Sequence, residues 1–351
     1  MVFKRKDHLV GLDIGSRTIK ACEIIQTKKG RTLEKFGMID IESGLIEDGS
    51  IKNPDVVAGA IRQLYQTHHI RENNVAISIG GYSVIVKKIN VQTMSEDQLQ
   101  DSIQFEAEQY IPFDISDVNL DFQILGENEQ NPNQMSVLLV AAKKDMVSDY
   151  VNLAQMAGLN PCIIDVDAFA LQNIFEVNYD SKDENIALID IGASKTSLNI
   201  LKDDASVFMR DVSLGCGQIN QRIASITDST MEEAEKLKFG DQSDKLSNED
   251  LADIVSAVVT DWCTEIRRAL DFFYSTYPDE QIKKIVLSGG GGGIKEFRQL
   301  LAVETSAEVQ TINPSESIAA DESRFDPSYI ESVAPQAAIC MGLAIRRVDD
   351  K

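Results

Sequence analysis

The feature that most constrains the fold of this chain is a short motif that occurs twice. The first copy, GLDIGSRTIK, runs from Gly11 to Lys20, and the second, LIDIGASKTSLNI, runs from Leu188 to Ile200. In each copy an apolar stretch reaches an aspartate, Asp13 or Asp190, and then Ile-Gly and small or hydroxyl-bearing residues. This pattern predicts two β-hairpins with tight, glycine-led turns. Two copies so far apart in one chain predict a duplicated fold with two lobes.

The two hairpins have the composition of phosphate-binding loops. Glycine lets the backbone approach a phosphate, and the amides and hydroxyls that follow can donate to its oxygens. These residues are Gly15, Ser16, Arg17 and Thr18 in the first copy, and Gly192, Ala193, Ser194, Lys195 and Thr196 in the second. We expect the hairpins to face each other across a cleft, with Asp13 and Asp190 directed at one Mg²⁺ ion, which favours carboxylates combined with phosphate oxygens. Either copy alone would be better explained by an ordinary hairpin turn, and it is the repetition that favours phosphate binding.

Two further segments extend the predicted nucleotide site. A run of glycines lies between a predicted strand and a predicted helix, and its first four members are Gly289, Gly290, Gly291 and Gly292. Without side chains this loop can lie against an adenine or a ribose, and the helix start can meet a phosphate. Glu235 and Lys238 share one face of a predicted helix and could hold the ribose hydroxyls and the base edge. A solvated ion pair would explain the same spacing.

Composition excludes several classes of function. The chain has 351 residues and a formal net charge of −22, which repels nucleic acid and bare anionic membranes. Its five cysteines are scattered, and two of its three histidines are adjacent, so neither a disulfide framework nor a zinc site is predicted. No apolar run approaches the roughly 20 residues of a membrane helix, and the N-terminus does not read as a signal peptide. We therefore expect a cytoplasmic protein that is peripheral to any membrane and reaches it through a protein partner.

The order of predicted elements places an insertion in the first half of an α/β chain. Strand and helix patterns predict a first lobe from residues 1–82 and 159–180, and a second lobe from residues 181–351. The second lobe includes a helical subdomain at about 218–275. Between the two parts of the first lobe, residues 83–158 show a β-α-β-β-α pattern, which we interpret as an inserted partner-binding subdomain.

The set of motifs resembles a known superfamily. In this order, the two hairpins, IIDVDAFAL between them, AEKLK, the glycine loop and the closing AAICMGLAIR resemble the actin and heat-shock-chaperone ATPases. The resemblance implies a duplicated, ribonuclease H-like fold that binds ATP with Mg²⁺. Within the superfamily the chain is similar to the branch of the cell-division protein FtsA, which carries an extra subdomain in its first half. It resembles still more closely the PilM family of type IV pilus assembly proteins, through FEAEQYIPFD and VNLDFQIL.

The PilM resemblance implies a cytosolic, ATP-binding adaptor of the pilus inner-membrane assembly platform. Such an adaptor holds the cytosolic N-terminal peptide of a PilN-like membrane protein in a groove beside the insertion. The candidates for the groove wall are Tyr110, Ile111, Pro112 and Phe113, which could equally form a core cluster at a helix end. Asp165 matches the position that orients the attacking water, where a carboxylate could act as general base, and Asp167 is close by. The resemblance implies at most slow ATP hydrolysis and leaves self-association open.

Two alternatives stay open beside the adaptor. An FtsA-like filament-forming division protein would usually carry an amphipathic membrane helix after the last core helix, and the sequence ends at IRRVDDK without one. A small-molecule kinase, such as a sugar or acetate kinase, shares the duplicated hairpins but normally has large insertions for its substrate. The one clear insertion here has the pattern of a partner-binding module.

Overall fold

The first lobe is built on a mixed six-stranded sheet, in a computed structural model that describes residues 8–128, 131–180, 184–239 and 245–348. In spatial order the strands are β10 (Asn160–Val166), β6 (Asn74–Ile79), β1 (Val10–Ile14), β2 (Thr18–Thr27), β3 (Gly30–Asp40) and β16 (Ile318–Ala320). Antiparallel pairing of β1 with β2 confirms the first predicted hairpin, and β6 runs parallel to β1. The tip of the predicted 126–133 loop and the predicted lobe boundary at 181 fall at least partly outside the described residues.

The second lobe repeats this arrangement in a five-stranded sheet. Its strands in spatial order are β13 (Ala205–Val212), β12 (Thr196–Lys202), β11 (Asn185–Ile191), β14 (Ile282–Ser288) and β15 (Glu308–Thr311). The predicted meander of β11, β12 and β13 is confirmed, and β14 runs parallel to β11 as β6 runs parallel to β1. Each lobe therefore has an antiparallel hairpin beside a parallel strand, which confirms the predicted duplication.

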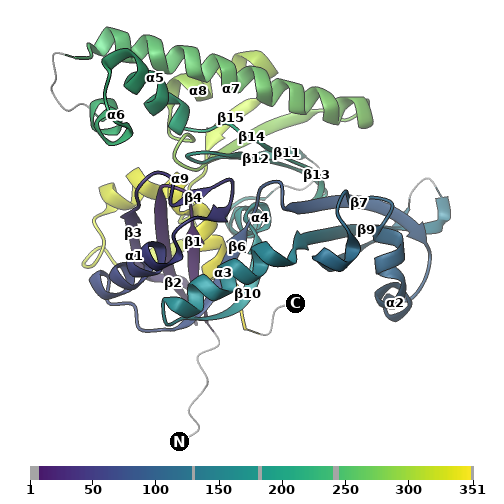
Figure 1. The fold of residues 1–351 in the computed structure, drawn as a ribbon. Coiled ribbons are helices and arrows are strands. Elements are labelled where there is room, and N and C mark those ends of the chain that lie inside the picture. The colour runs from purple at the N-terminus through teal and green to yellow at the C-terminus, as the bar shows by residue number, and fades with distance from the viewer. Residues whose placement is uncertain (1–7, 129–130, 181–183, 240–244, 349–351) are drawn as a thin grey trace, which may run out of the picture.

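Helices flank both sheets (Figure 1). They are α1 (Pro54–Thr67), α3 (Lys144–Met156) and α4 (Asp167–Asn178) in the first half, and α5 (Gly217–Thr227), α6 (Met231–Lys238), α7 (Asn248–Thr276), α8 (Lys295–Thr305) and α9 (Pro327–Ala344) in the second. Their starts follow local chemistry. Asn53 accepts a hydrogen bond from the Val56 amide ahead of Pro54 in α1, and Thr230 forms a capping box with Glu233 in α6.

The last helix returns the chain to the first lobe. We predicted that everything after residue 181 belongs to the second lobe, but β16 pairs with β3, and α9 packs against α4, β1 and β2. Glycine makes this packing possible, because a Cβ at Gly11 would lie 2.1 Å from the carbonyl oxygen of Cys340. At Gly342 a Cβ would lie 1.8 Å from the carbonyl oxygen of Ala170. One apolar cluster therefore contains residues from both ends of the chain.

The insertion is a three-stranded sheet with one covering helix, and it lies beside the two lobes (Figure 1). Its elements are β7 (Val84–Gln92), α2 (Glu96–Ala107), a short 3-10 turn (Ile115–Asp117), β8 (Val118–Asn128) and β9 (Asn131–Lys143). These elements share an apolar core of their own. The predicted module also included α3, but the buried face of α3, through Tyr150 and Leu153, packs into the core of α1 and the first sheet. The insertion with its own core is thus smaller than the predicted 83–158.

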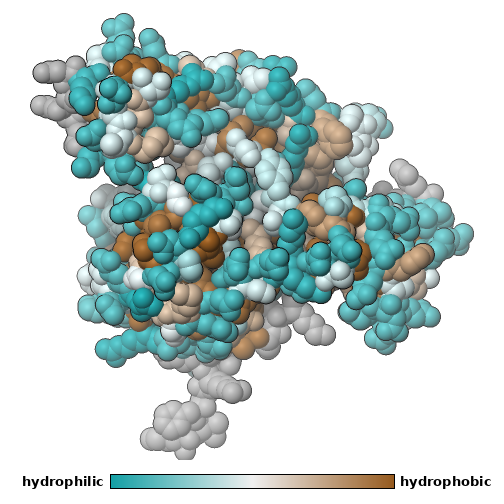
Figure 2. All heavy atoms as spheres, in the orientation of Figure 1, coloured by the Kyte–Doolittle hydropathy of each residue, from teal (hydrophilic) through white to brown (hydrophobic). Residues whose placement is uncertain are grey.

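The visible surface is mainly hydrophilic, in keeping with the net charge of −22 (Figure 2). Over the described residues, none of the helices combines the length and apolarity needed to cross a membrane.

Candidate functional site

The two predicted phosphate hairpins meet across the gap between the lobes. The hydroxyls of Ser16 and Ser194, at the two turns, lie 3.0 Å apart. Each turn is closed by a matching backbone bond, from the Gly15 amide to the Thr18 oxygen at 3.1 Å and from the Gly192 amide to the Lys195 oxygen at 2.9 Å. The structure therefore brings together two turns that are far apart in the sequence and alike in geometry.

Both turns carry backbone amides that have no acceptor in the described part of the chain. Within the described chain, none of the backbone amides of Ser16, Arg17, Ala193 and Ser194 donates to another residue. Successive amides of this kind form an anion-binding concavity. The buried hydroxyl of Thr196 donates to the Leu214 carbonyl oxygen at 3.0 Å, so its proton is not available to a phosphate in this arrangement.

The glycine loop packs tightly against the second hairpin. Gly289 has a φ of +79°, and a Cβ there would lie 2.4 Å from the carbonyl oxygen of Ile191. A Cβ at Gly291 would lie 2.5 Å from the Ile191 side chain, and one at Gly292 would lie 2.8 Å from the Ser288 oxygen. Gly290 has more room. Three of the four predicted glycines thus let the loop approach its own sheet, which places its backbone beside Asp190.

Glu235 and Lys238, which we predicted to lie near the nucleotide base, are both on α6, and Glu235 reaches the first hairpin. Glu235 forms an ion pair with Arg17 of the other lobe and a second one with Lys238, whose Nζ lies 3.6 Å from its carboxylate. The Nη1 atom of Arg17 is buried and has no hydrogen-bond partner in the described part of the chain. Buried guanidinium groups normally satisfy their donors. The arrangement therefore leaves one cationic donor at the cleft that an anion could satisfy.

The two aspartates of the hairpins have different surroundings. Asp13 pairs in register with Lys20 across the hairpin, and Lys20 Nζ donates to Asp13 Oδ2 at 2.9 Å. Burial disfavours the ammonium of Lys20, but attraction to Asp13 outweighs it and holds its pKa above the ordinary value. The sequence analysis did not single out Lys20, although the tight turn predicts that it lies opposite Asp13.

Asp190 has no ion pair with a cationic side chain among the described residues. Burial raises its pKa to about 6; a hydrogen bond from Ser288 opposes this rise, and repulsion from Asp13 adds to it. A carboxylate of raised pKa beside a phosphate-type turn is a suitable place for a cation. The described residues contain no group of three or more His, Cys, Asp or Glu side chains that could hold a metal alone. A Mg²⁺ ion here would need phosphate oxygens and water in addition to Asp190 and Asp13, which fits its preferences.

The carboxylate that faces this region from the first lobe is Asp167. It starts α4, and Lys195 Nζ donates to it at 2.8 Å. Burial alone would raise the pKa of Asp167, but the charge of Lys195 outweighs it and lowers the value. The predicted catalytic residue, Asp165, is buried on β10 and accepts a hydrogen bond from Arg346 at 2.9 Å. Asp167, rather than Asp165, forms the ion pair with Lys195 of the second hairpin.

The predicted groove residues lie at the end of α2. Ile111 is buried in the core of the insertion, so it is not available as a surface wall, which corrects the prediction. Tyr110 and Phe113 are half-buried against the same core. Lys87 lies over the Tyr110 ring at 5.5 Å and Lys143 over the Phe113 ring at 4.4 Å, as cation–π contacts.

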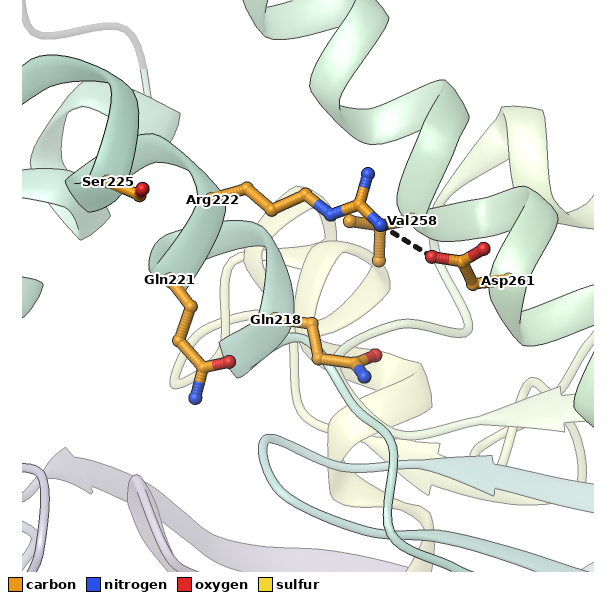
Figure 3. A pocket seen from close by; sticks show the side chains of 6 residues that line it. All are labelled: Gln218, Gln221, Arg222, Ser225, Val258 and Asp261. Atoms are coloured by element: carbon orange, nitrogen blue, oxygen red, sulfur yellow. Dashed lines mark hydrogen bonds and ion pairs between the residues drawn. The ribbon is translucent and has the colours of Figure 1, made fainter.

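A separate cavity of about 230 Å³ lies between α5 and α7 (Figure 3). Its lining residues are Gln218, Gln221, Arg222, Ser225, Val258 and Asp261. Arg222 and Asp261 form an ion pair at 2.5 Å across it. None of the predicted nucleotide residues lines this cavity, so it is not the predicted site.

Comparison with known proteins agrees with this geometry. The model of a family described as type IV pilus assembly protein PilM matches residues 11–348. A solved chain of the PilM-PilN type IV pilus biogenesis complex superposes with a TM-score of 0.87 at 27% identity, over 98% of this chain and 100% of that one.

Two more distant structures share the fold. The ethanolamine utilization protein EutJ from Carboxydothermus hydrogenoformans has a TM-score of 0.60 at 12% identity, over 96% of this chain and 89% of its own. MreB5 of Spiroplasma citri, bound to ADP, has a TM-score of 0.50 at 12% identity, over 97% of this chain and 95% of its own. The predicted actin-like fold is thereby confirmed.

Proposed function

The chain belongs to the PilM family of type IV pilus assembly proteins, and on this premise we propose that it is an ATP-binding adaptor of the pilus inner-membrane platform. ATP would occupy the gap between the lobes, and the insertion would serve a membrane partner. The adaptor would itself be cytoplasmic and would reach the membrane through that partner.

The observation that carries nucleotide binding is the meeting of the two hairpin turns. Their hydroxyls lie 3.0 Å apart, and their amides donate to no other residue of the described chain. Donors that converge from two lobes suit the oxygens of a phosphate tail, because each amide gains a charge-assisted hydrogen bond. The ammonium of Lys195 and the partnerless Nη1 of Arg17 would add positive charge on either side.

Mg²⁺ would neutralise part of the negative charge of the phosphates. Asp190 and Asp13 would be the carboxylates of the protein that hold it. Asp190 suits this role better, because Asp13 is already neutralised by Lys20. Glu235 and Lys238 would lie at the base side, and the backbone of residues 289–292 would lie beside the adenosine. These roles follow the positions of the side chains around the two turns.

The ion pairs around the site support a protein that binds ATP and hydrolyses it slowly at most. A general base must be free to accept a proton from water. Asp167 is tied to Lys195, which lowers its pKa, and Asp165 is tied to Arg346. As long as Lys195 holds Asp167 and Arg346 holds Asp165, neither carboxylate can act as an efficient base, so we infer that ATP serves mainly as a structural or switching ligand.

The partner would be the cytosolic N-terminal peptide of a PilN-like membrane protein. A similar chain is known in a complex with PilN, and the insertion has a core of its own to support a binding surface. We propose that the surface next to Tyr110, Pro112 and Phe113 contributes to the groove. An extended peptide there would gain backbone hydrogen bonds and apolar anchors.

Calorimetric titration tests both parts of the proposal. Mg-ATP should bind the wild-type chain, and Lys195→Gln should weaken binding about tenfold or more, since one charge-assisted contact is worth about 1.5 to 3 kcal/mol. Lys283→Gln removes an exposed lysine of the same lobe and is the matched control. Equal loss in both variants, or no binding by the wild type, would contradict the nucleotide site.

The partner is tested with the N-terminal peptide of the PilN-like protein from the same organism, titrated with and without Mg-ATP. Tyr110→Ala should weaken peptide binding, whereas Phe105→Ala, an exposed aromatic on α2, should not. Absence of peptide binding alongside tight ATP binding would favour the filament or kinase alternatives. Turnover stimulated by a sugar or acetate would support a kinase instead.

A further inference from the structure

One of the two connections between the first lobe and the insertion begins with two glycines beside the second hairpin. Residues 80–83 connect β6 to β7, and the first two of them are Gly80 and Gly81. A Cβ at Gly80 would lie 2.4 Å from Asp167 Oδ2 and 2.4 Å from Lys195 Nζ. The backbone of the junction therefore lies directly on the ion pair that joins the two lobes. Gly81 has a φ of +89°, so its conformation also favours glycine.

A second contact ties the junction to the sheet of the second lobe. The Gly81 amide donates to Asp211 Oδ2 at 2.6 Å, and the Ser197 hydroxyl donates to Asp211 Oδ1 at 2.6 Å. Asp211 on β13 lies opposite Ser197 on β12, and β12 begins one residue after Lys195. One carboxylate thus links the strand that follows the phosphate turn to the start of the insertion.

The same junction carries the neighbouring contacts between the insertion and the second lobe. The Ser213 hydroxyl lies 3.2 Å from the Tyr82 hydroxyl, and β13 contacts β7, as their adjacent positions in Figure 1 also show. A shift of Gly81 would therefore move the start of β7, where the insertion begins, relative to β13.

Lys195 connects this junction with the phosphate turn. It closes the turn through its carbonyl oxygen, while its ammonium is shared between Asp167, with an ion pair, and Asp211, whose charge acts at longer range. A bound triphosphate would compete for this ammonium. Withdrawal of the ammonium would remove the positive charge of Lys195 from Asp167 and Asp211, which lie on either side of Gly80–Gly81, and the two carboxylates would repel each other more strongly.

We propose that Lys195, Asp167 and Asp211 form a latch that transmits occupancy of the phosphate site to the insertion through Gly80 and Gly81. The latch is closed without nucleotide and opens when the phosphates attract Lys195. This inference rests on the proposed nucleotide binding and adds the route by which the nucleotide state reaches the partner-binding module. The coupling needs no change in the core of the insertion, only a change in residues 80–83, which lead into β7.

Amide hydrogen exchange at Gly81, followed by mass spectrometry with fragmentation, tests the latch. Mg-ATP at saturation should speed exchange of this amide about threefold to tenfold, the range expected when one net hydrogen bond is lost. In Asp211→Ala the amide should exchange rapidly already without ATP and no longer respond to it. ATP should still bind, up to about tenfold more tightly than in the wild type, because the coupling between the two sites is reciprocal. Asp271→Ala removes an exposed carboxylate of α7 and should behave as the wild type.

A second variant guards against a folding defect in Asp211→Ala. Ser197→Ala removes only the other hydrogen bond to Asp211 and should raise the exchange of Gly81 less, with a smaller ATP response. Tight ATP binding with unchanged or slower Gly81 exchange in the wild type overturns the latch and leaves the proposed function standing. Failure of the wild type to bind ATP overturns both. The two failures are therefore distinguished by the same titration.

Discussion

The two phosphate hairpins share a motif but differ in how their charges are balanced. The first hairpin pairs Asp13 with Lys20, although burial still raises the pKa of Asp13 above its ordinary value. Among the described residues the second hairpin has no such partner for Asp190, whose pKa burial raises to about 6. Each turn carries one cationic side chain that forms an ion pair with the opposite lobe. Arg17 pairs with Glu235, and Lys195 pairs with Asp167. The difference teaches that the two copies share the backbone turn but not the charge pairing: Asp13 has a cationic partner, and Asp190 has none among the described residues.

The largest effect is expected from breaking the buried pair of the first hairpin. Asp13→Leu leaves Lys20 buried without its partner and should lower the free energy of unfolding by about 3 kcal/mol, as for other broken buried pairs. Chemical denaturation measures this loss. Asp13→Leu combined with Lys20→Met should recover much of it, because two apolar side chains replace the pair. Equal destabilisation in the single and double variants would contradict the assigned role of the pair.

The next largest effect concerns ligand binding at the second hairpin. Asp190→Ala should weaken Mg-ATP binding about tenfold to a hundredfold, because it removes a carboxylate available to the cation. Wild-type affinity should also fall as the pH drops through about 6, where Asp190 takes up a proton. Calorimetry from pH 5 to 8 measures both. A pH-independent affinity that persists in Asp190→Ala would place the cation elsewhere.

The same aspartate predicts a pH dependence of stability without ligand. Its folded pKa of about 6 lies above the ordinary aspartate pKa of 3.8, so the folded chain binds more protons than the unfolded chain between these pH values, and stability falls as the pH rises from about 4 to 6. Asp190→Asn should therefore stabilise the chain at pH 7 by about 1 to 2 kcal/mol and have little effect near pH 4. Unfolding curves at the two pH values measure the difference. A destabilised variant at pH 7 would show that the Asp190 carboxylate is stabilised by contacts that outweigh its burial.

The smallest effect is expected at the ion pair between Arg17 and Glu235. Both side chains are partly exposed, at 22% and 28%, so the pair should contribute less than about 1 kcal/mol to stability. A double-mutant cycle with Arg17→Gln and Glu235→Gln, in low and high salt, measures the coupling. A coupling energy well above 1 kcal/mol that resists salt would indicate that this pair holds the lobes closed.

Local patterns in the sequence predicted correctly the two hairpins and the glycine loop between a strand and a helix. Hydrophobic periodicity and turn residues act over a few positions, so Gly15 can be interpreted from its neighbours. The likeness between two distant motifs also predicted the duplicated lobes. The actin-like fold could therefore be inferred before any coordinates were known.

Long-range packing decided the rest. The return of α9 to the first lobe, the packing of α3 away from the insertion, and the choice of Asp167 over Asp165 beside Lys195 depend on contacts between segments far apart in the chain. Strand alternation places two aspartates two positions apart on the same side, but Asp165 lies on β10 whereas Asp167 starts α4, so the end of the strand redirects the second side chain. The sequence thus determined the local turns and the repeated plan, and only the tertiary structure decided which charges meet, because charge pairing depends on distances that local patterns do not encode.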